Sequence, residues 1–146
     1  MDNESPKYVF VDVETEGLKA QVLLQIAAVT EEGKVFAEYI KPSQNIPLSC
    51  TQITGLYSKN KELFKNGNKL NAHPIRKVLR KFFDWISELN GNVHLVCYNG
   101  FTFDVKVLLT HYKRQKLNFP GNITFVHDPL PTFRKFMKAD QIKDFK

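Results

Sequence analysis

The chain has 146 residues, of which 42% are hydrophobic and 25% are charged. This length and composition are typical of one globular domain, so we expect a single domain over residues 1–146. No stretch approaches the roughly 20 apolar residues of a membrane span, and residues 1–7 lack an apolar signal core. We therefore expect an intracellular protein, in the nucleus or the cytoplasm, with no membrane contact. The net charge of +6 fits a polyanionic partner without requiring one.

Residues 8–16 are predicted to form a buried strand that carries two carboxylates at its end. Most of residues 8–13 are β-branched or aromatic, and Gly17 ends the run. Side chains alternate along a strand, so Phe10, Asp12 and Glu14 share one face. Unpaired charges in a core cost several kcal/mol or more. A divalent cation, which prefers oxygen ligands, is the neutralising group that best fits these two residues.

Two further strands are predicted over residues 22–30 and 35–41, joined by a hairpin turn at Gly33. Three consecutive strands with tight links favour an antiparallel meander. Residues 42–71 are polar and interrupted by proline and glycine, so we expect loops there, with one short helix near residues 51–53.

The clearest predicted helix covers residues 73–89, where apolar residues recur at steps of three and four. Asn71 or His73 is its expected cap, and Asn90 with Gly91 its expected stop. The remaining predicted elements are a strand over 93–98, a helix over 103–113, a strand over 123–126 and a helix over 130–137. In the helix over 103–113, the residues predicted to face inward are Val105, Leu108, Leu109 and Tyr112. Strands that alternate with helices indicate crossover units added to the meander, and hence a mixed α/β sheet.

A third carboxylate, Asp104, lies where the fourth predicted strand gives way to a helix. Ligands of open α/β sheets gather at such places, so we expect Asp104 to face Asp12 and Glu14. The alternative is that Asp104 only caps the helix that follows it, a role that aspartate fills well.

Together these residues resemble the DEDD family of 3′–5′ exonucleases, which have the ribonuclease H-like fold. The family's first motif, Asp-x-Glu followed by Thr, a variable residue, Gly and Leu, stands here as Asp12-Val-Glu14-Thr-Glu-Gly-Leu18. Its second, Asn-x-x-x-(Phe/Tyr)-Asp, stands as Asn99-Gly-Phe-Thr-Phe103-Asp104. Smaller likenesses lie at residues 25–29, 53–56 and 128–131. The Asn66-Gly67 turn before the long helix further resembles the exonuclease-like domains of PML-related animal proteins.

The resemblance implies a metal-dependent exonuclease that hydrolyses DNA or RNA from the 3′ end and releases nucleoside monophosphates. Asp12, Glu14 and Asp104 would be its catalytic residues and would bind two Mg²⁺ or Mn²⁺ ions. The implied fold is a mixed sheet with an antiparallel three-stranded meander and crossover helices.

Three more residues are candidates for substrate binding by the same resemblance. Leu18 and Phe103 would border the terminal nucleotide through apolar or stacking contacts. Each also has a plain packing role as its alternative. Asn99 is a further candidate, although an asparagine in a turn also bonds its own backbone.

The family's third motif, His-x-x-x-x-x-Asp or Tyr-x-x-x-Asp on a later helix, is absent. None of the four histidines, His73, His94, His111 and His127, precedes the required aspartate on a following helix. We therefore expect a chain truncated before its last helices, either a fragment or a naturally short product. Loss of a positioned general base lowers the rate by about 10²–10⁴-fold, so weak or no activity is expected from this chain alone.

Two other functions are compatible with the fold. A non-catalytic module that binds nucleic acid or protein would retain the architecture without the chemistry. A transposase or integrase core is disfavoured, because its carboxylates are not expected as Asp-x-Glu on the first strand. No residue pattern distinguishes DNA from RNA or defines an oligomeric state.

Overall fold

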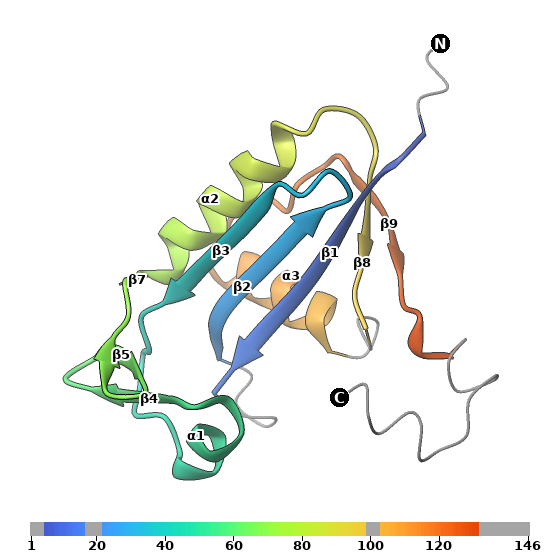
Figure 1. Cartoon of the computed structure of the whole chain (residues 1–146). Helices are drawn as coiled ribbons and strands as arrows, with labels where there is room; N and C mark the ends of the chain where they lie inside the picture. Colours follow the sequence, from blue (N-terminus) through green and yellow to red (C-terminus); the bar gives the residue numbers. More distant parts are fainter. Residues whose placement is uncertain (1–4, 17–21, 99–102, 132–146) are drawn as a thin grey trace.

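The computed structural model describes residues 5–16, 22–98 and 103–131, with strands and helices alternating after an initial meander (Figure 1). Its strands are β1 Lys7–Thr15, β2 Leu23–Thr30, β3 Val35–Ile40, β4 Leu56–Lys59, β5 Glu62–Lys65, β6 Asn68–Lys69, β7 Ala72–His73, β8 Val93–Val96 and β9 Ile123–His127. Its helices are α1 Leu48–Thr54, α2 Ile75–Ser87 and α3 Asp104–Arg114. The predicted mixed α/β fold is confirmed.

One six-stranded sheet, in the order β7-β3-β2-β1-β8-β9, forms the centre of the molecule. The strands β1, β2 and β3 are antiparallel neighbours, as the meander predicted. On the other side of β1, β8 and then β9 add in parallel. Because parallel neighbours need a crossover connection, α2 and α3 stand between successive strands of the chain.

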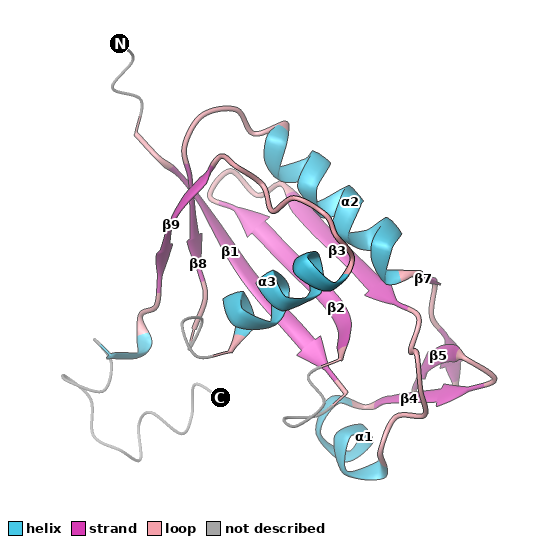
Figure 2. Ribbon diagram, turned by 180° about the vertical axis from the view of Figure 1, so that it is seen from behind, coloured by secondary structure: helices cyan, strands magenta, loops and turns pink. Residues whose placement is uncertain are grey.

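Both long helices cover the same face of this sheet, as the front and rear views agree (Figures 1 and 2). The β1 residues that point toward the helices, Val9, Val11 and Val13, are at most 5% exposed. On the opposite face, which no described helix covers, Phe10 is 46% exposed and Asp12 is also exposed. The predicted alternation is right, and the predicted burial holds only for the side of the strand that faces the helices. Asp12 therefore avoids the full cost of a charge in the core, although the protein around it still desolvates its carboxylate in part.

The predicted apolar stripe of α2 forms the centre of the core. Val78, Leu79, Phe82 and Ile86 are fully buried against the sheet, and the Phe82 ring meets Phe36 edge to face at 5.3 Å.

The start of α2 differs from the prediction. Pro74 holds the N-cap position, and no side chain caps the helix, so capping by Asn71 or His73 is wrong. A residue that precedes proline disfavours the helical region, which keeps His73 out of the helix. The stop is confirmed, because Asn90 and Gly91 take φ values of 53° and 81°.

The buried face of α3 includes Leu108 and Tyr112 as predicted, and Val105 packs against the core, but the prediction is wrong for Leu109. Leu109 is 45% exposed, whereas Val107, Leu108, His111 and Tyr112 are buried. The helix begins at Asp104, whose own side chain is buried, and this sets the phase of the residues that follow. Leu109 was therefore wrongly assigned to the core.

The stretch 42–71, predicted as loops around one short helix, contains more structure than expected. The short helix is present as α1, but β4, β5 and β6 form a separate antiparallel sheet, and β7 joins the edge of the main sheet. Two tight turns close the small sheet, at Asn60–Lys61 and at Asn66–Gly67, and all four residues have positive φ. Leu56 and Leu63 are buried in a second small core. Little in the sequence indicated this core, because most of the residues around them are polar.

No helix in the part of the chain that the structure covers is long and apolar enough to cross a membrane. Of the predicted helix over 130–137, only residues 130 and 131 are described, and both are helical.

Candidate active site

The three predicted carboxylates come from two elements that meet at one edge of the main sheet. Asp12 and Glu14 lie near the end of β1, and Asp104 is the first residue of α3. The Val13 backbone N–H donates a hydrogen bond to the Asp104 carboxylate, which ties the start of α3 to β1. The structure thus brings Asp104 beside Asp12 and Glu14.

The buried Asp104 carboxyl group has a strongly perturbed acidity. Its side chain is 5% exposed, and burial, followed by the charges of Asp12, Glu14 and Asp128, raises its pKa to about 7. The hydrogen bond from Val13 opposes this rise. The site therefore disfavours the anionic form of Asp104 unless a proton or a cation neutralises it.

Asp12 and Glu14 are perturbed in the same direction. Although the Asp12 side chain reaches solvent on the open face, the surrounding protein atoms desolvate its carboxylate and raise its pKa. Burial and the charge of Asp12 raise the pKa of Glu14, while the ammonium group of Lys65 lowers it. A cationic side chain from the small sheet therefore acts directly on this acidic group.

A fourth carboxylate, Asp128, belongs to the same electrostatic cluster. It follows β9, and its Oδ1 accepts a hydrogen bond of 3.0 Å from the Leu130 backbone N–H. The buried Cys97 thiol lies close enough to this cluster to be affected by it. Burial and the charges of Asp104, Asp128 and Asp12 raise the pKa of the thiol to about 12. In the sequence, Asp128 stood out only through a family likeness. Its place just after a strand parallel to β8 was the signal that could have added it to the site.

The alternative role of Asp104 as a helix cap is not observed. Phe103 is the N-cap residue of α3, and no side chain forms a cap hydrogen bond. Asp104 instead lies in the first turn, where the helix dipole favours a negative charge.

Of the three predicted substrate-binding residues, only Phe103 can be placed. Its ring is half-buried and packs against the main core, which fits its packing role. Leu18 and Asn99 lie outside the described residues.

Each of the four histidines can be placed in the fold, and His127 directly precedes Asp128. His94 and His127, on neighbouring strands, face each other with Nδ1 and Nε2 2.9 Å apart. His111 is buried in α3, and His73 ends β7.

The donor atoms of the site suit a hard divalent cation, because Asp12, Glu14 and Asp104 offer only carboxylate oxygens. Burial and, after it, mutual repulsion raise the pKa of Asp104 and Glu14, and a bound cation would offset both effects. As the side chains stand, however, no group of three His, Cys, Asp or Glu residues within 5–16, 22–98 and 103–131 is arranged to hold a metal ion.

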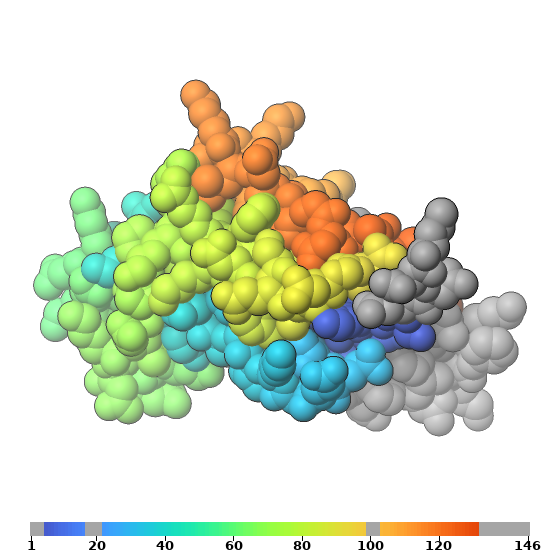
Figure 3. Space-filling model, turned by 90° about the horizontal axis from the view of Figure 1, so that it is seen from above, coloured from blue at the N-terminus to red at the C-terminus, as the bar shows by residue number. Residues whose placement is uncertain are grey.

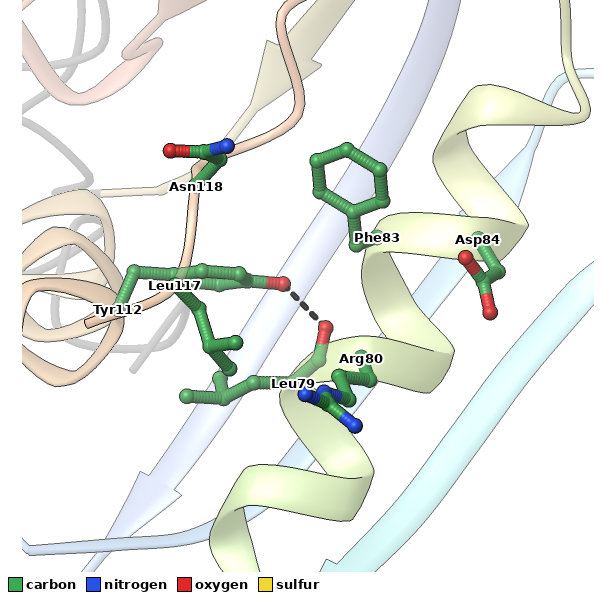
Figure 4. A pocket seen from close by; sticks show the side chains of 7 residues that line it. All are labelled: Leu79, Arg80, Phe83, Asp84, Tyr112, Leu117 and Asn118. Atoms are coloured by element: carbon green, nitrogen blue, oxygen red, sulfur yellow. Dashed lines mark hydrogen bonds between the residues drawn. The ribbon is translucent and has the colours of Figure 1, made fainter. Parts of the chain in front are cut away.

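The surface of the described part contains several hollows, and two of them can be compared with the carboxylate site. One, of about 290 Å³, lies between α2 and the segment after α3, where Tyr112 Oη donates a hydrogen bond of 2.6 Å to the Leu79 carbonyl (Figure 4). It shares no residue with the carboxylate set. The other, of about 330 Å³, is an apolar hollow on the open sheet face that includes Phe10, Asp12 and Val29.

The sheet order, the crossover helices and the carboxylates at the strand ends define a ribonuclease H-like fold. Escherichia coli exonuclease I in complex with a dA16 oligonucleotide superposes with a TM-score of 0.64 at 20% identity, over 89% of this chain and 29% of that chain. Exonuclease I in its SSB-Ct complex gives a TM-score of 0.65 at 20% identity, over 90% of this chain and 30% of that chain. The chain therefore has the fold of a DEDD 3′–5′ exonuclease, as its sequence motifs predicted.

A curated relative agrees with this likeness. The 3′-5′ exonuclease DinG of Bacillus subtilis (strain 168) is 31% identical over 100 residues, which are 64% of this chain and 10% of the relative. No protein-family model matches the sequence. The chain thus spans about a tenth of its curated relative and under a third of these solved structures.

Proposed function

We propose that residues 1–146 belong to a single metal-dependent 3′–5′ exonuclease domain, which hydrolyses nucleic-acid phosphodiesters and releases nucleoside monophosphates. One observation carries the proposal. In an exonuclease fold, β1 and α3 place Asp12, Glu14 and Asp104 within electrostatic reach of one another, and burial, followed by the charges of Asp12 and Glu14, raises the pKa of Asp104 to about 7. The end of DNA or RNA is the proposed substrate.

Asp12, Glu14 and Asp104 would hold Mg²⁺ or Mn²⁺, which supplies an activated water and charge stabilisation for the leaving 3′ oxygen. Asp104 has to lose its proton before it can serve as a ligand, and the first turn of α3 favours its anionic form. Lys65 places a positive charge near Glu14, where it offsets the charge that the phosphate adds. Leu18, Phe103 and Asn99 remain the proposed contacts of the terminal nucleotide.

The expected activity of this chain alone is low. The third family motif, which carries the general base and the last metal ligand, is not among its residues. Without a positioned base the rate falls by about 10²–10⁴-fold. The net charge of +6 is also compatible with the second candidate, a nucleic-acid-binding module that keeps the exonuclease fold without catalysis.

The test is cleavage of a 5′-labelled single-stranded oligonucleotide with excess protein and Mg²⁺ or Mn²⁺, resolved as a ladder of shortened products. We expect shortening from the 3′ end that stops with EDTA and in an Asp12→Asn variant. Glu32→Gln, a neutralisation at the exposed turn between β2 and β3, is the matched control.

Shortening that persists in Asp12→Asn would contradict the assigned site. Salt-sensitive binding of the oligonucleotide without cleavage would favour the module. Products that shorten from the 5′ end would overturn the proposed polarity.

A further inference from the structure

We propose that the small sheet β4–β6 is a binding surface for the single-stranded nucleic acid that leads into the carboxylate site, with Lys59 and Lys61 contacting its phosphates. The identity of this ligand rests on the proposed function. Position, charge, aromatic content and backbone conformation each support the surface.

The small sheet is held beside the acidic site. It forms one end of the molecule, coloured green in the space-filling view (Figure 3). The helix α1, which precedes it, is tied to the end of β1 by Cys50 Sγ, which donates to the Thr15 carbonyl at 3.2 Å. Lys65 of β5 packs over Gly55 at the end of α1, and its charge acts on Glu14. A nucleic-acid single strand that extends from the carboxylates on this side of the molecule would therefore contact the small sheet first.

The charge of the small sheet is positive and largely unneutralised. Residues 56–70 contain four lysines, Lys59, Lys61, Lys65 and Lys69, and one acidic residue, Glu62. Glu62 is already paired, with Lys41 at 3.3 Å and with Lys69 at 3.9 Å. Within the described part of the chain, the exposed Lys59 and Lys61 have no ion-pair partner, which leaves their ammonium groups free for an anionic ligand.

An aromatic pair lies among these lysines. Tyr57 and Phe64 are opposite each other in register, and their half-buried rings stack 5.4 Å apart at an interplanar angle of 15°. Lys59 lies two residues after Tyr57, so strand alternation places it on the same face as the rings. Lys69 lies on this face as well, because it pairs with Phe64 across β5 and β6. Aromatic rings combined with basic side chains are the usual elements of sequence-independent binding to single strands.

The β4–β5 turn keeps a lysine where the backbone favours glycine. Asn60 and Lys61 have φ values of 52° and 62°, the conformation of a two-residue hairpin turn that strongly prefers Asn-Gly. The β5–β6 turn of the same sheet has this preferred pair, Asn66–Gly67. A strained residue of this kind points to a function for its side chain, which here is an exposed positive charge at the tip of the hairpin.

Lys61→Gly separates binding from folding, because it removes the charge and also relieves the turn. We expect the Lys59→Gln/Lys61→Gly variant of the full chain to unfold at the same or a higher urea concentration than wild type. The probe is a 5′-fluorescein-labelled dT20, with anisotropy measured in EDTA over a series of salt concentrations. The matched control is Lys34→Gln/Lys113→Gln, two exposed lysines on other elements.

The hairpin variant should bind dT20 about 5- to 30-fold more weakly at low salt, with a salt slope reduced by about 1.4, equivalent to two phosphate contacts. The control should stay within about twofold of wild type. Equal affinities of the two variants for dT20 would contradict the proposal that the small sheet binds the single strand. An equal loss on a blunt duplex would overturn its assignment to a single strand.

A small substrate separates this proposal from the proposed function. The p-nitrophenyl ester of thymidine 5′-monophosphate has a single nucleotide and no preceding strand to lie on the hairpin, so its hydrolysis should be unchanged in the hairpin variant. If wild type hydrolyses neither the ester nor an oligonucleotide, the proposed function fails, and the binding comparison still decides the surface. Loss of ester hydrolysis in the hairpin variant would overturn a role confined to the strand.

Discussion

Asp12 acts electrostatically on Asp104, although the two residues come from different elements far apart in the chain, and burial together with the charge of Asp12 raises the pKa of Asp104 to about 7. Burial is the largest cause of that rise, and Glu14 and Asp128 add to it. A group so perturbed lowers the stability of the fold whenever it is ionised. A bound cation would reduce this repulsion between the carboxylates.

The first prediction concerns the pH dependence of stability in the metal-free protein. The pKa of Asp104 is about 7 in the folded state against an ordinary 3.8, so the folded state holds its proton longer than the unfolded state does. This residue therefore costs stability as pH rises from about 4 to 8, on the order of 3 kcal/mol in total. In Asp104→Asn the cost should vanish, so its advantage over wild type in urea unfolding should grow from about pH 4 to pH 8.

Glu32→Gln serves as the control for this series, because its side chain lies on an exposed turn. It should follow the pH dependence of wild type. An advantage of Asp104→Asn that is constant from pH 4 to 8 would show that the Asp104 carboxyl group is not perturbed in the fold.

The second prediction concerns metal binding to the carboxylates. A cation that binds only the folded state stabilises it, so millimolar Mn²⁺ should raise the unfolding temperature of wild type. Asp12→Asn and Asp104→Asn each remove a carboxylate charge and one of its two oxygens, and should reduce that shift to about a third or less. An unchanged shift in both variants would place the bound metal elsewhere.

The third prediction concerns the buried Glu16 carboxylate. Glu16 is 1% exposed, Gln44 Nε2 donates a hydrogen bond to its Oε1, and its Oε2 has no hydrogen-bond partner among the residues described. Gln44→Ala removes the donor and should lower the free energy of unfolding by about 1–3 kcal/mol. In a Glu16→Gln background, where no charge needs the donor, the same change should cost less. Equal costs in the two backgrounds would contradict the coupling.

The fourth prediction concerns Tyr112, which joins α3 to α2. Its hydroxyl donates to the Leu79 carbonyl at 2.6 Å inside the core, and its ring meets Phe119 edge to face at 5.3 Å. Tyr112→Phe keeps the ring contact and should lower the free energy of unfolding by about 1–1.5 kcal/mol, measured in urea. Tyr39→Phe, on a half-buried ring of β3, should cost less than half as much. Equal costs would mean that the bond to Leu79 adds no stability of its own.

Local patterns predicted most of the elements. The alternation around β1 assigned Phe10, Asp12 and Glu14 to one face, and the apolar stripe of α2 identified its buried residues. The motifs around Asp12 and Asp104 pointed to the correct fold. The small sheet was missed because its alternation is short and most of its residues are polar. On α3 only Leu109 was wrongly assigned to the core, and the burial of Asp104 was missed because a hydrophobic pattern cannot reveal a buried charged residue.

By itself, the sequence determined the order of the main elements and the residue types at the strand ends, because periodicity and turn residues act locally. Tertiary structure decided three other matters. The main sheet is covered by described helices on one face only, Asp128 joins the carboxylates, and Lys65 comes from a separate sheet to act on Glu14. Burial and charge act through space between segments that are distant in the chain, so they exist only once the strands have paired.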